Sequence, residues 1–286
     1  MIKINKVSPD KHKYLQIIVD IANSPESLYY MGTLPLDRRP TLAIVGTRKP
    51  TAYGTEVTRQ FAGELARRGI VIVSGLALGV DALAHEAALD AGGTTIAVLA
   101  SGLPDITPRT NRQLGERILR QGGAIISEYD TDHHVYRTDF LARNRIVSGL
   151  SDGILITEAS SRSGTLNTAM HALDQGREVF VIPGNITSPL SAGTNALIRQ
   201  GATPVTCVGD ILSVLMPSVR PRQTQMPLGA TQLESDILQL FSAGVRDGDL
   251  IQQQLGIPAH QLSTALTMLE IAGSIRSLGA NQWTIR

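Results

Sequence analysis

The sequence has little of what an exported or disulfide-bonded protein needs. Its 286 residues include one cysteine, Cys207, so no internal disulfide can form and a disulfide scaffold is excluded. No run approaches the roughly 18 consecutive apolar residues of a membrane helix, and the first residues lack the apolar core of a signal peptide. We therefore expect a cytoplasmic protein without membrane insertion.

Aromatic residues and net charge are also scarce. Phe, Trp and Tyr make up 4% of the chain against 27 glycines, which disfavours a β-sandwich, because such folds use aromatic cross-strand pairs. With 42% hydrophobic and 18% charged residues the composition excludes intrinsic disorder over most of the chain. The formal net charge of +1 does not indicate a partner by itself.

Six short apolar runs predict a parallel sheet. They are β-branched and continuous rather than alternating, as in strands that are buried on both faces. The runs cover residues 42–45, 70–73, 96–99, 124–126, 154–156 and 179–182, and segments of helical periodicity separate them at 54–68, 80–91, 110–121, 140–150 and 165–175. This alternation predicts an α/β fold with a doubly wound, mostly parallel sheet, an extended Rossmann-like domain.

The composition divides the chain into four parts. Residues 1–40 are interpreted as an N-terminal appendage packed on the sheet domain, with a helix over 11–21 and an extended piece over 27–31. The sheet domain covers 41–215, and the proline-rich, polar stretch 216–230 predicts a linker. Residues 231–286, with three short helical segments and a terminal hairpin, are typical of a winged-helix domain.

In an open parallel sheet, ligands bind at the carboxyl ends of the strands, and the first of these loops combines a glycine with a hydroxyl and two cations. Gly46, Thr47, Arg48 and Lys49 precede a helix start near Gly54, where backbone amides attract anions. The pattern predicts a phosphate-binding loop; the alternative is that the glycines only permit a tight turn. Neither a Walker A motif nor G-x-G-x-x-G occurs, which disfavours P-loop hydrolysis and dinucleotide oxidoreduction.

Histidines offer few catalytic arrangements. Asp81 and His85 are four residues apart on one helix face, so a hydrogen bond between them is feasible, and a structural histidine is the favoured interpretation. No G-x-S-x-G elbow occurs and Cys207 has no evident histidine partner, so acyl transfer lacks a nucleophile. His133 and His134 are adjacent on a loop and rarely converge on one ion, so we expect neither a metal site nor a cofactor.

A segment before the fourth expected helix gathers arginines around one aromatic ring. Asp139 is expected to cap a helix that starts at Phe140. Guanidinium groups of Arg137, Arg143 and Arg145 match phosphate oxygens, and the Phe140 ring is suited to stack on a base. Arg143 and Arg145 lie about 200° apart around the helix axis, so both cannot face one crevice. The alternative for one of them is a salt bridge to the sheet domain.

The last loop and the charge distribution complete the pattern. Ser163, Gly164 and Thr165 open another helix, and their backbone amides are expected to hold a second phosphate. Residues 1–224 carry a net charge of +3 and residues 225–286 a net charge of −2. The expected recognition helix of the winged helix, 259–272, has no Lys or Arg, which favours a protein-binding or regulatory role over reading duplex DNA.

Taken in order, these motifs resemble the DNA-processing protein A family (DprA, also called Smf). The matching stretches are Ala43-Ile44-Val45-Gly46-Thr47-Arg48, Val73-Ser74-Gly75-Leu76-Ala77, Gly79-Val80-Asp81 with Ala84-His85, Ile96-Ala97-Val98-Leu99, Ser127-Glu128-Tyr129, Phe140 with Arg143-Asn144-Arg145, Ser163-Gly164-Thr165-Leu166, and Arg177-Glu178-Val179-Phe180 running to Pro183-Gly184. The resemblance covers about residues 25–215, and the C-terminal winged helix also resembles that of the family. Thr107-Pro108 departs from it, since the family often has Tyr-Pro there, and the helical N-terminal domain of many members is missing or reduced to residues 1–40.

The resemblance implies a function as well as a fold. It implies single-stranded DNA binding on the Rossmann-like domain, a homodimer, and loading of the RecA recombinase during natural transformation, without catalysis. It places Arg48, Phe140 and Arg143 in the DNA pocket and Arg137 in the neighbourhood of a basic pocket residue. The residues expected at the nucleic acid are Gly46, Thr47, Arg48, Arg137, Phe140, Arg143, Asn144, Arg145, Ser163, Gly164 and Thr165.

Other functions stay open. The loops also resemble the cytokinin-activating LOG phosphoribohydrolases, which cleave a nucleoside monophosphate with a P-G-G-x-G-T-x-x-E motif. Here Asn167 and Thr168 occupy the acidic stretch of that motif, so a carboxylate that would stabilise a developing ribosyl cation is absent from it. A nucleotide-sensing protein is a further alternative. A transcription regulator that reads duplex DNA is disfavoured by the cation-free helix.

Overall fold

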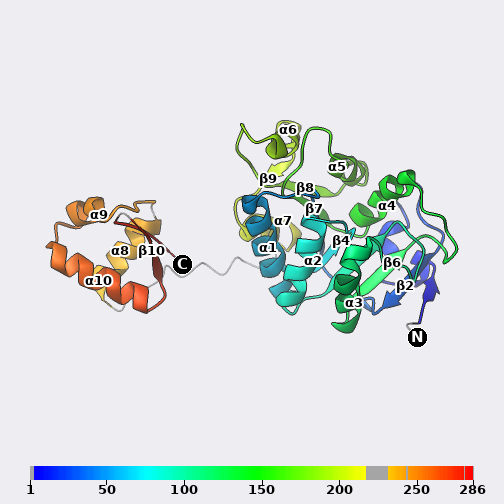
Figure 1. Ribbon diagram of the computed structural model, residues 1–286, viewed down its shortest axis with the longest axis horizontal. Helices are drawn as coiled ribbons and strands as arrows, with labels where there is room; N and C mark the ends of the chain where they lie inside the picture. The colour runs from blue at the N-terminus through cyan, green and yellow to red at the C-terminus, as the bar shows by residue number, and fades with distance from the viewer. Residues whose placement is uncertain (1–2, 217–230, 243, 280, 286) are drawn as a thin grey trace. The chain divides into compact units, whose positions relative to one another are not determined.

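The computed structural model describes residues 3–216, 231–242, 244–279 and 281–285 (Figure 1). Contacts divide the chain into two units, Met1–Ser218 and Val219–Arg286. The linker expected at 216–230 lies outside the described residues except for Met216.

The described residues of the first unit form a nine-stranded sheet in the order β1-β2-β6-β5-β4-β3-β7-β8-β9. Its strands are β1 (Asn5–Val7), β2 (Leu28–Gly32), β3 (Thr41–Val45), β4 (Val71–Ser74), β5 (Thr95–Leu99), β6 (Ala124–Ser127), β7 (Gly153–Ile156), β8 (Glu178–Val181) and β9 (Thr203–Pro204). Neighbouring strands from β6 to β9 pair in parallel, and β1 and β2 add an antiparallel edge. The predicted α/β class and the mostly parallel sheet are confirmed.

Helices cover both faces of the sheet (Figure 1). They are α1 (Ala52–Arg67), α2 (Val80–Asp90), α3 (Arg112–Arg120), α4 (Arg137–Gly149), α5 (Thr165–Asp174), α6 (Ala192–Arg199) and α7 (Val208–Leu215). Side chains of α4, α5 and α6 pack with one set of strand residues, and those of α1, α2, α3 and α7 pack with the alternate set. Because both faces are covered, β3 to β7 are buried at every residue, and their apolar residues form continuous runs rather than alternating ones.

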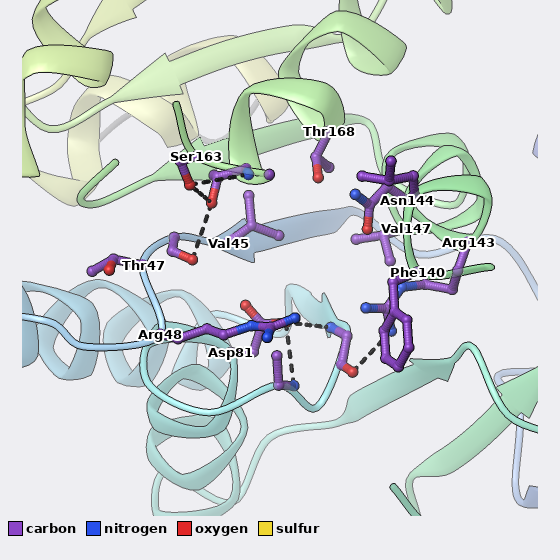
Figure 2. Close-up of a pocket in the computed structure, with 16 residues that line it drawn as sticks. Val45, Thr47, Arg48, Asp81, Phe140, Arg143, Asn144, Val147, Ser163 and Thr168 are labelled. Carbon is purple, nitrogen blue, oxygen red and sulfur yellow. Dashed lines mark hydrogen bonds between the residues drawn. The ribbon is translucent and has the colours of Figure 1, made fainter. Parts of the chain in front are cut away.

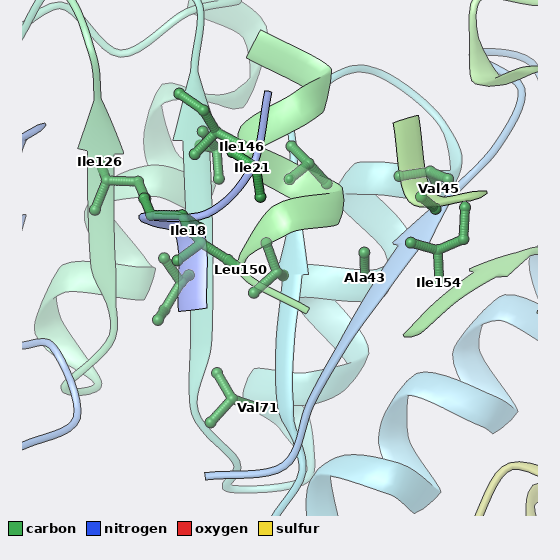
Figure 3. Close-up of a cluster of buried hydrophobic side chains, with 14 of the residues drawn as sticks. Ile18, Ile21, Ala43, Val45, Val71, Ile126, Ile146, Leu150 and Ile154 are labelled. Carbon is green, nitrogen blue, oxygen red and sulfur yellow. The ribbon is translucent and has the colours of Figure 1, made fainter. Parts of the chain in front are cut away.

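The N-terminal residues are part of the sheet as well as packed on it. The extended piece expected at 27–31 is β2, which runs antiparallel beside β6. The helix expected over 11–21 is wrong: the chain forms two short 3₁₀ turns, Pro9–Lys11 and Gln16–Ile18. Apolar residues there have helical spacing, but the β-branched run from Ile17 to Val19 weakens a helix, and burial of Tyr14 and Ile18 fixes the backbone instead. Figure 3 shows Ile18 and Ile21 beside Ile146 of α4 and Leu150, the residue that follows the helix.

The strand order reverses beside β3. From β3 the chain proceeds through β4 and β5 to β6 on one side, and then crosses to β7 and β8 on the other side. Such a switch point leaves a crevice between the loops that follow the two central strands, and ligands bind there in open α/β sheets. The loops after β3 and β7 are those that carry Gly46, Thr47, Arg48 and Ser163, Gly164, Thr165.

The second unit has the predicted winged-helix order. Helices α8 (Gln232–Ser242), α9 (Gly248–Leu255) and α10 (Ala259–Ile271) precede a hairpin of β10 (Ile275–Gly279) and β11 (Gln282–Ile285). Asp247 caps α9 by accepting hydrogen bonds from two backbone amides, and Gly256 ends it in the left-handed region at φ 62°. Residues such as Phe241, Leu262 and Leu266 form a separate small core.

Candidate nucleic-acid interface

Two adjoining cavities open at the carboxyl ends of the central strands. The first, of about 230 Å³, lies between the loops after β3, β4 and β7 and the inner side of α4; the second, of about 530 Å³, extends past the start of α4 to the loop after β5. Both are bordered by Arg48, Gly75, Phe140 and Arg143, so they are parts of one depression. Figure 2 shows Arg48 reaching into the first cavity from the β3 side, with Phe140 and Arg143 across from it.

The structure brings ten of the eleven expected residues to this depression. Nine line the first cavity and Arg137 lines the second. Arg145 lines neither: its Nη2 donates to Glu128 Oε1 at 2.6 Å and its Nε to Asn23 O at 2.9 Å. The expected salt bridge of one arginine to the sheet domain is therefore formed by Arg145, and Arg143 faces the depression.

A buried carboxylate, to which the sequence pattern assigned no role, fixes the loop after β3 by hydrogen bonds. Glu158, 3% exposed, accepts hydrogen bonds from Thr51 N at 2.9 Å and Thr51 Oγ1 at 2.6 Å, and its backbone oxygen accepts from Thr47 N at 2.8 Å. Thr51 in turn caps α1 by accepting from Gly54 N at 3.0 Å. The sequence signal for this role is that Glu158 is the one acidic residue in a loop of small and hydroxyl residues.

Among the described residues, the guanidinium of Arg48 extends unpaired from this braced loop. Gly79, at φ 78°, lies so close to the loop that an added Cβ would be 2.6 Å from the Arg48 carbonyl carbon. Arg48 is exposed, and within the described part of the chain no hydrogen bond or ion pair engages its guanidinium. A fixed backbone therefore presents a free charge at the switch point.

The loop after β7 is tied to the loop after β3 by a hydroxyl. Thr165 Oγ1 donates to Gly46 O at 3.0 Å, and Ser163 Oγ donates to Thr165 Oγ1 at 2.9 Å. The expectation that three amides here hold a phosphate is wrong for two of them, because Ser163 N donates to Ser160 O at 3.1 Å and Thr165 N to Ser163 Oγ at 3.2 Å. Only the amide of Gly164 among these three is left without a partner in the described structure.

Two buried groups of opposite charge, Arg143 and Asp81, line the first cavity, and Arg143 also lines the second. Arg143, 7% exposed, donates through Nη1 to Gly75 O at 2.8 Å and to Val98 O. Asp81 Oδ2 accepts from Gly75 N at 3.0 Å and Ala77 N at 3.4 Å. Burial raises the pKa of Asp81 and the Arg143 charge opposes that rise; burial likewise lowers the pKa of Arg143 and Asp81 opposes that fall. The Arg143 guanidinium therefore places its positive charge just beneath the surface of the depression.

His85 does not bond Asp81, so that expectation is wrong. Its Nδ1 lies 2.6 Å from Thr95 Oγ1, which itself donates to Ile72 O at 2.7 Å. Burial, and secondarily the Arg143 charge, lower the pKa of His85 to about 3. The imidazole is therefore neutral at physiological pH and has a structural role.

Helix α4 begins three residues earlier than expected. Asp139 is not the N-cap but the third helical residue, and its Oδ2 accepts from Tyr136 N at 2.8 Å and lies 2.7 Å from His133 Nε2. Burial raises the pKa of Asp139, but the bonds from Tyr136 and His133 outweigh it and the pKa is lowered. The His133 ring stacks on Tyr129 at 3.9 Å between centroids.

Because α4 starts at Arg137, the helix presents both Arg137 and Phe140 at its exposed first turns. Arg137 and Phe140 are three residues apart and lie on neighbouring turns of one helix face. Phe140 is 38% exposed and, like Arg137, borders the second cavity. Arg137 has no hydrogen-bond or ion-pair partner in the described structure. An aromatic ring and a free cation are thereby presented together.

The described residues offer neither a cluster of metal ligands nor a membrane-spanning helix. Three or more His, Cys, Asp or Glu side chains nowhere converge there in a way that would hold a metal ion. None of the helices in the described ranges combines the length and the apolar composition needed to cross a lipid bilayer.

The fold and the site together define a Rossmann-like α/β protein with a strand-end depression and a winged-helix unit. A model of the family described as DNA recombination-mediator protein A matches residues 5–216, and a model described as the DprA winged helix domain matches residues 221–281. The chain belongs to the DNA recombination-mediator protein A family.

Curated relatives cover most of the chain. Protein Smf of Escherichia coli is 38% identical over 284 residues, which are 95% of this chain and 75% of that protein. The DNA processing protein DprA of Bacillus subtilis is 39% identical over 213 residues, 74% of this chain and 71% of that protein.

Solved structures of relatives share the fold. DNA processing protein A from Streptococcus pneumoniae aligns with a TM-score of 0.68 at 38% identity and covers 74% of each chain. DNA processing protein A from Helicobacter pylori, whose structure is described in terms of its single-stranded DNA binding mode, aligns with a TM-score of 0.66 at 34% identity over 76% of this chain and 97% of that one.

Proposed function

We propose that this protein binds single-stranded DNA in the strand-end depression. The observation that carries the proposal is the convergence of two unpaired guanidinium groups, Arg48 and Arg137, with the exposed ring of Phe140 on one surface. The cations would contact phosphates and the ring would stack on a base. The structure of the Helicobacter pylori relative, which concerns a single-stranded DNA binding mode, supports the same assignment.

The geometry favours single strands over duplex. A ring can stack only on a base that has left its own stack, and a duplex would have to be opened first. The buried Arg143 would add positive potential beneath the strand while keeping its hydrogen bonds to backbone carbonyls. Gly46, Thr47, Asn144, Ser163, Gly164 and Thr165 would form the walls along which the strand lies.

We further propose that the depression is not catalytic. Asp81 is the one carboxylate that lines either cavity, and its Oδ2 is occupied by two backbone amides. A phosphoribohydrolase needs a carboxylate near the ribosyl cation. Incubation with adenosine monophosphate should therefore release no adenine; release in stoichiometric excess would contradict this proposal.

The biological role that we propose is delivery of single-stranded DNA to a recombinase in the cytoplasm. Membership of the DNA recombination-mediator protein A family supports this role. RecA would be the partner and natural transformation the setting, and the protein would act as a homodimer.

The first test removes one free cation. Arg48→Ala should weaken binding of a fluorescent oligonucleotide while leaving the thermal midpoint unchanged, because Arg48 has no internal partner in the described structure. Each phosphate contact on a single strand contributes about −0.7 to the slope of log K against log salt, so roughly four contacts give the unaltered protein a slope of about −3. The Arg48→Ala variant should have a slope that is shallower by about 0.7.

The matched control is Arg67→Ala. Arg67 is exposed at the far end of α1 and lines neither cavity, so binding and slope should stay at the unaltered values. A flat salt response, or equal binding by the Arg48 and Arg67 variants, would remove the loop after β3 from the site.

A further inference from the structure

A third cavity, of about 430 Å³, lies at the same edge of the sheet and has no part in the function proposed above. It is lined by Thr51 and Tyr53 at the start of α1, by Glu158 after β7, and by residues 183–191 after β8. The sheet order β5-β4-β3-β7-β8 places the three cavities in one row, with the second cavity at the β5 end and the third at the β8 end.

The loop after β3 borders the first cavity with its first residues and the third cavity with its last. Thr47 and Arg48 border the first cavity, and Thr51, four residues after Thr47, borders the third. Glu158 holds both ends of that loop, through its backbone oxygen on Thr47 N and its carboxylate on Thr51. Since neighbouring strands are about 4.8 Å apart, a strand of DNA that crosses the β3 and β7 ends would reach the β8 end within a few nucleotides.

The walls of the third cavity are fixed without a ligand. Tyr53 Oη donates to Pro183 O at 3.3 Å, which holds the ring, while the side chain stays 49% exposed. The opposite turn is held by Asn195, whose Nδ2 donates to Gly184 O at 3.0 Å and whose Oδ1 accepts from Gly184 N at 3.3 Å. The aromatic face is therefore presented at low entropic cost to a ligand.

The charge of the lining selects the chemistry of the occupant. No Lys or Arg lines this cavity, and Glu158 contributes a carboxylate, so a phosphate group would be repelled. An uncharged planar group beside an exposed ring is favoured. We propose that Tyr53 is a second stacking platform, which holds a base of the same DNA strand whose phosphate lies at Arg48. This inference rests on the proposed single-strand binding and extends it toward β8.

The first experiment measures how affinity depends on strand length. Oligothymidylates of increasing length are titrated into the full chain and into Tyr53→Ala, Tyr53→Phe and Arg48→Ala variants. Tyr53→Ala should weaken the longer strands about fivefold or more and leave the shortest strand that binds within about twofold. Tyr53→Phe keeps the ring and loses only the bond to Pro183 O, so it should bind within about twofold at every length.

The second experiment needs no variant and decides the matter if Tyr53→Ala fails to fold. A 5-iododeoxyuridine is placed in turn at each position of a strand and irradiated on the unaltered protein, and the adducts are mapped by mass spectrometry. Adducts on Phe140 and on Tyr53 from two different positions are expected. Adducts on Phe140 alone, or equal length dependence in a folded Tyr53→Ala variant, would overturn the second platform. Failure of the proposed function gives a different result. Absence of adducts on both rings, together with unchanged binding by Arg48→Ala, would overturn single-strand binding in the depression itself.

Discussion

Gly75→Ala tests whether Arg143 is fixed in the floor of the depression. A Cβ at position 75 would lie 2.6 Å from Arg143 Cζ and Nη1, closer than any ordinary van der Waals contact. Arg143 borders both cavities, so the guanidinium can make room for the Cβ only by moving out toward them and away from its buried position. Its displacement would break the hydrogen bonds to Gly75 O and Val98 O, two buried acceptors.

The size of the effect follows from these losses. Overpacking costs about 1–3 kcal/mol and each lost hydrogen bond from the charged guanidinium about 1.5–3 kcal/mol, so partial relaxation leaves roughly 2–5 kcal/mol of lost unfolding free energy. For a unit of this size, 1 kcal/mol corresponds to about 2–4 °C, so the melting temperature should fall by roughly 5–15 °C. The affinity for single-stranded DNA should fall as well, because Arg143 borders both cavities.

Calorimetry of the full chain and titration with a labelled oligonucleotide provide the two readouts. Gly164→Ala is the matched control for stability, since an added Cβ there would meet nothing within 4 Å. Its melting temperature should stay within about 2 °C of the unaltered value. If Gly75→Ala has the same melting temperature as Gly164→Ala and binds DNA with unaltered affinity, then the Arg143 guanidinium is not fixed against Gly75.

Two further predictions concern groups outside the binding surface. His85 has a folded-state pKa of about 3 against an ordinary 6.5, so between these values the unfolded chain takes up a proton that the folded chain refuses, and stability should fall as pH drops below about 6.5, by up to about 1.4 kcal/mol per pH unit from this group. Denaturant unfolding across pH should show a shallower slope for His85→Asn, and an unchanged slope would mean that another group is responsible. Arg145→Ala leaves Glu128 without its partner, so it should lower the unfolding free energy by about 1–3 kcal/mol while single-strand affinity stays within about twofold; a selective loss of affinity would return Arg145 to the DNA.

Much of the fold could be predicted because the core strands carry an unambiguous signal. The strands β3 and β7 are buried at every residue and carry continuous apolar runs, since the sheet is covered on both faces, and the loops that follow such strands meet at one edge. The meeting of Arg48 with Thr165 could therefore be expected from the strand pattern alone. The antiparallel edge was only partly predicted, because β1 is three residues long and has no periodicity to detect.

The site details that were missed depend on partners distant in the sequence. Whether Arg143 or Arg145 faces the depression is decided by Val98 and Gly75 on one side and Glu128 on the other. The amide of Ser163 is used by a local turn that residue types alone do not specify. Helix geometry excludes that both arginines share one crevice, but the choice between them needs the packed structure.

The hydrogen bond from Thr165 Oγ1 to Gly46 O joins residues that are 119 positions apart in the chain. A ribosome would have completed β3, β4, β5 and β6 well before the wall contributed by the loop after β7 exists. A growing chain would thus expose Arg48 on an unfinished edge, without the second side that confines a strand. On the proposed function, capture of DNA in the full depression would be reserved for molecules whose central strands have all been made and paired.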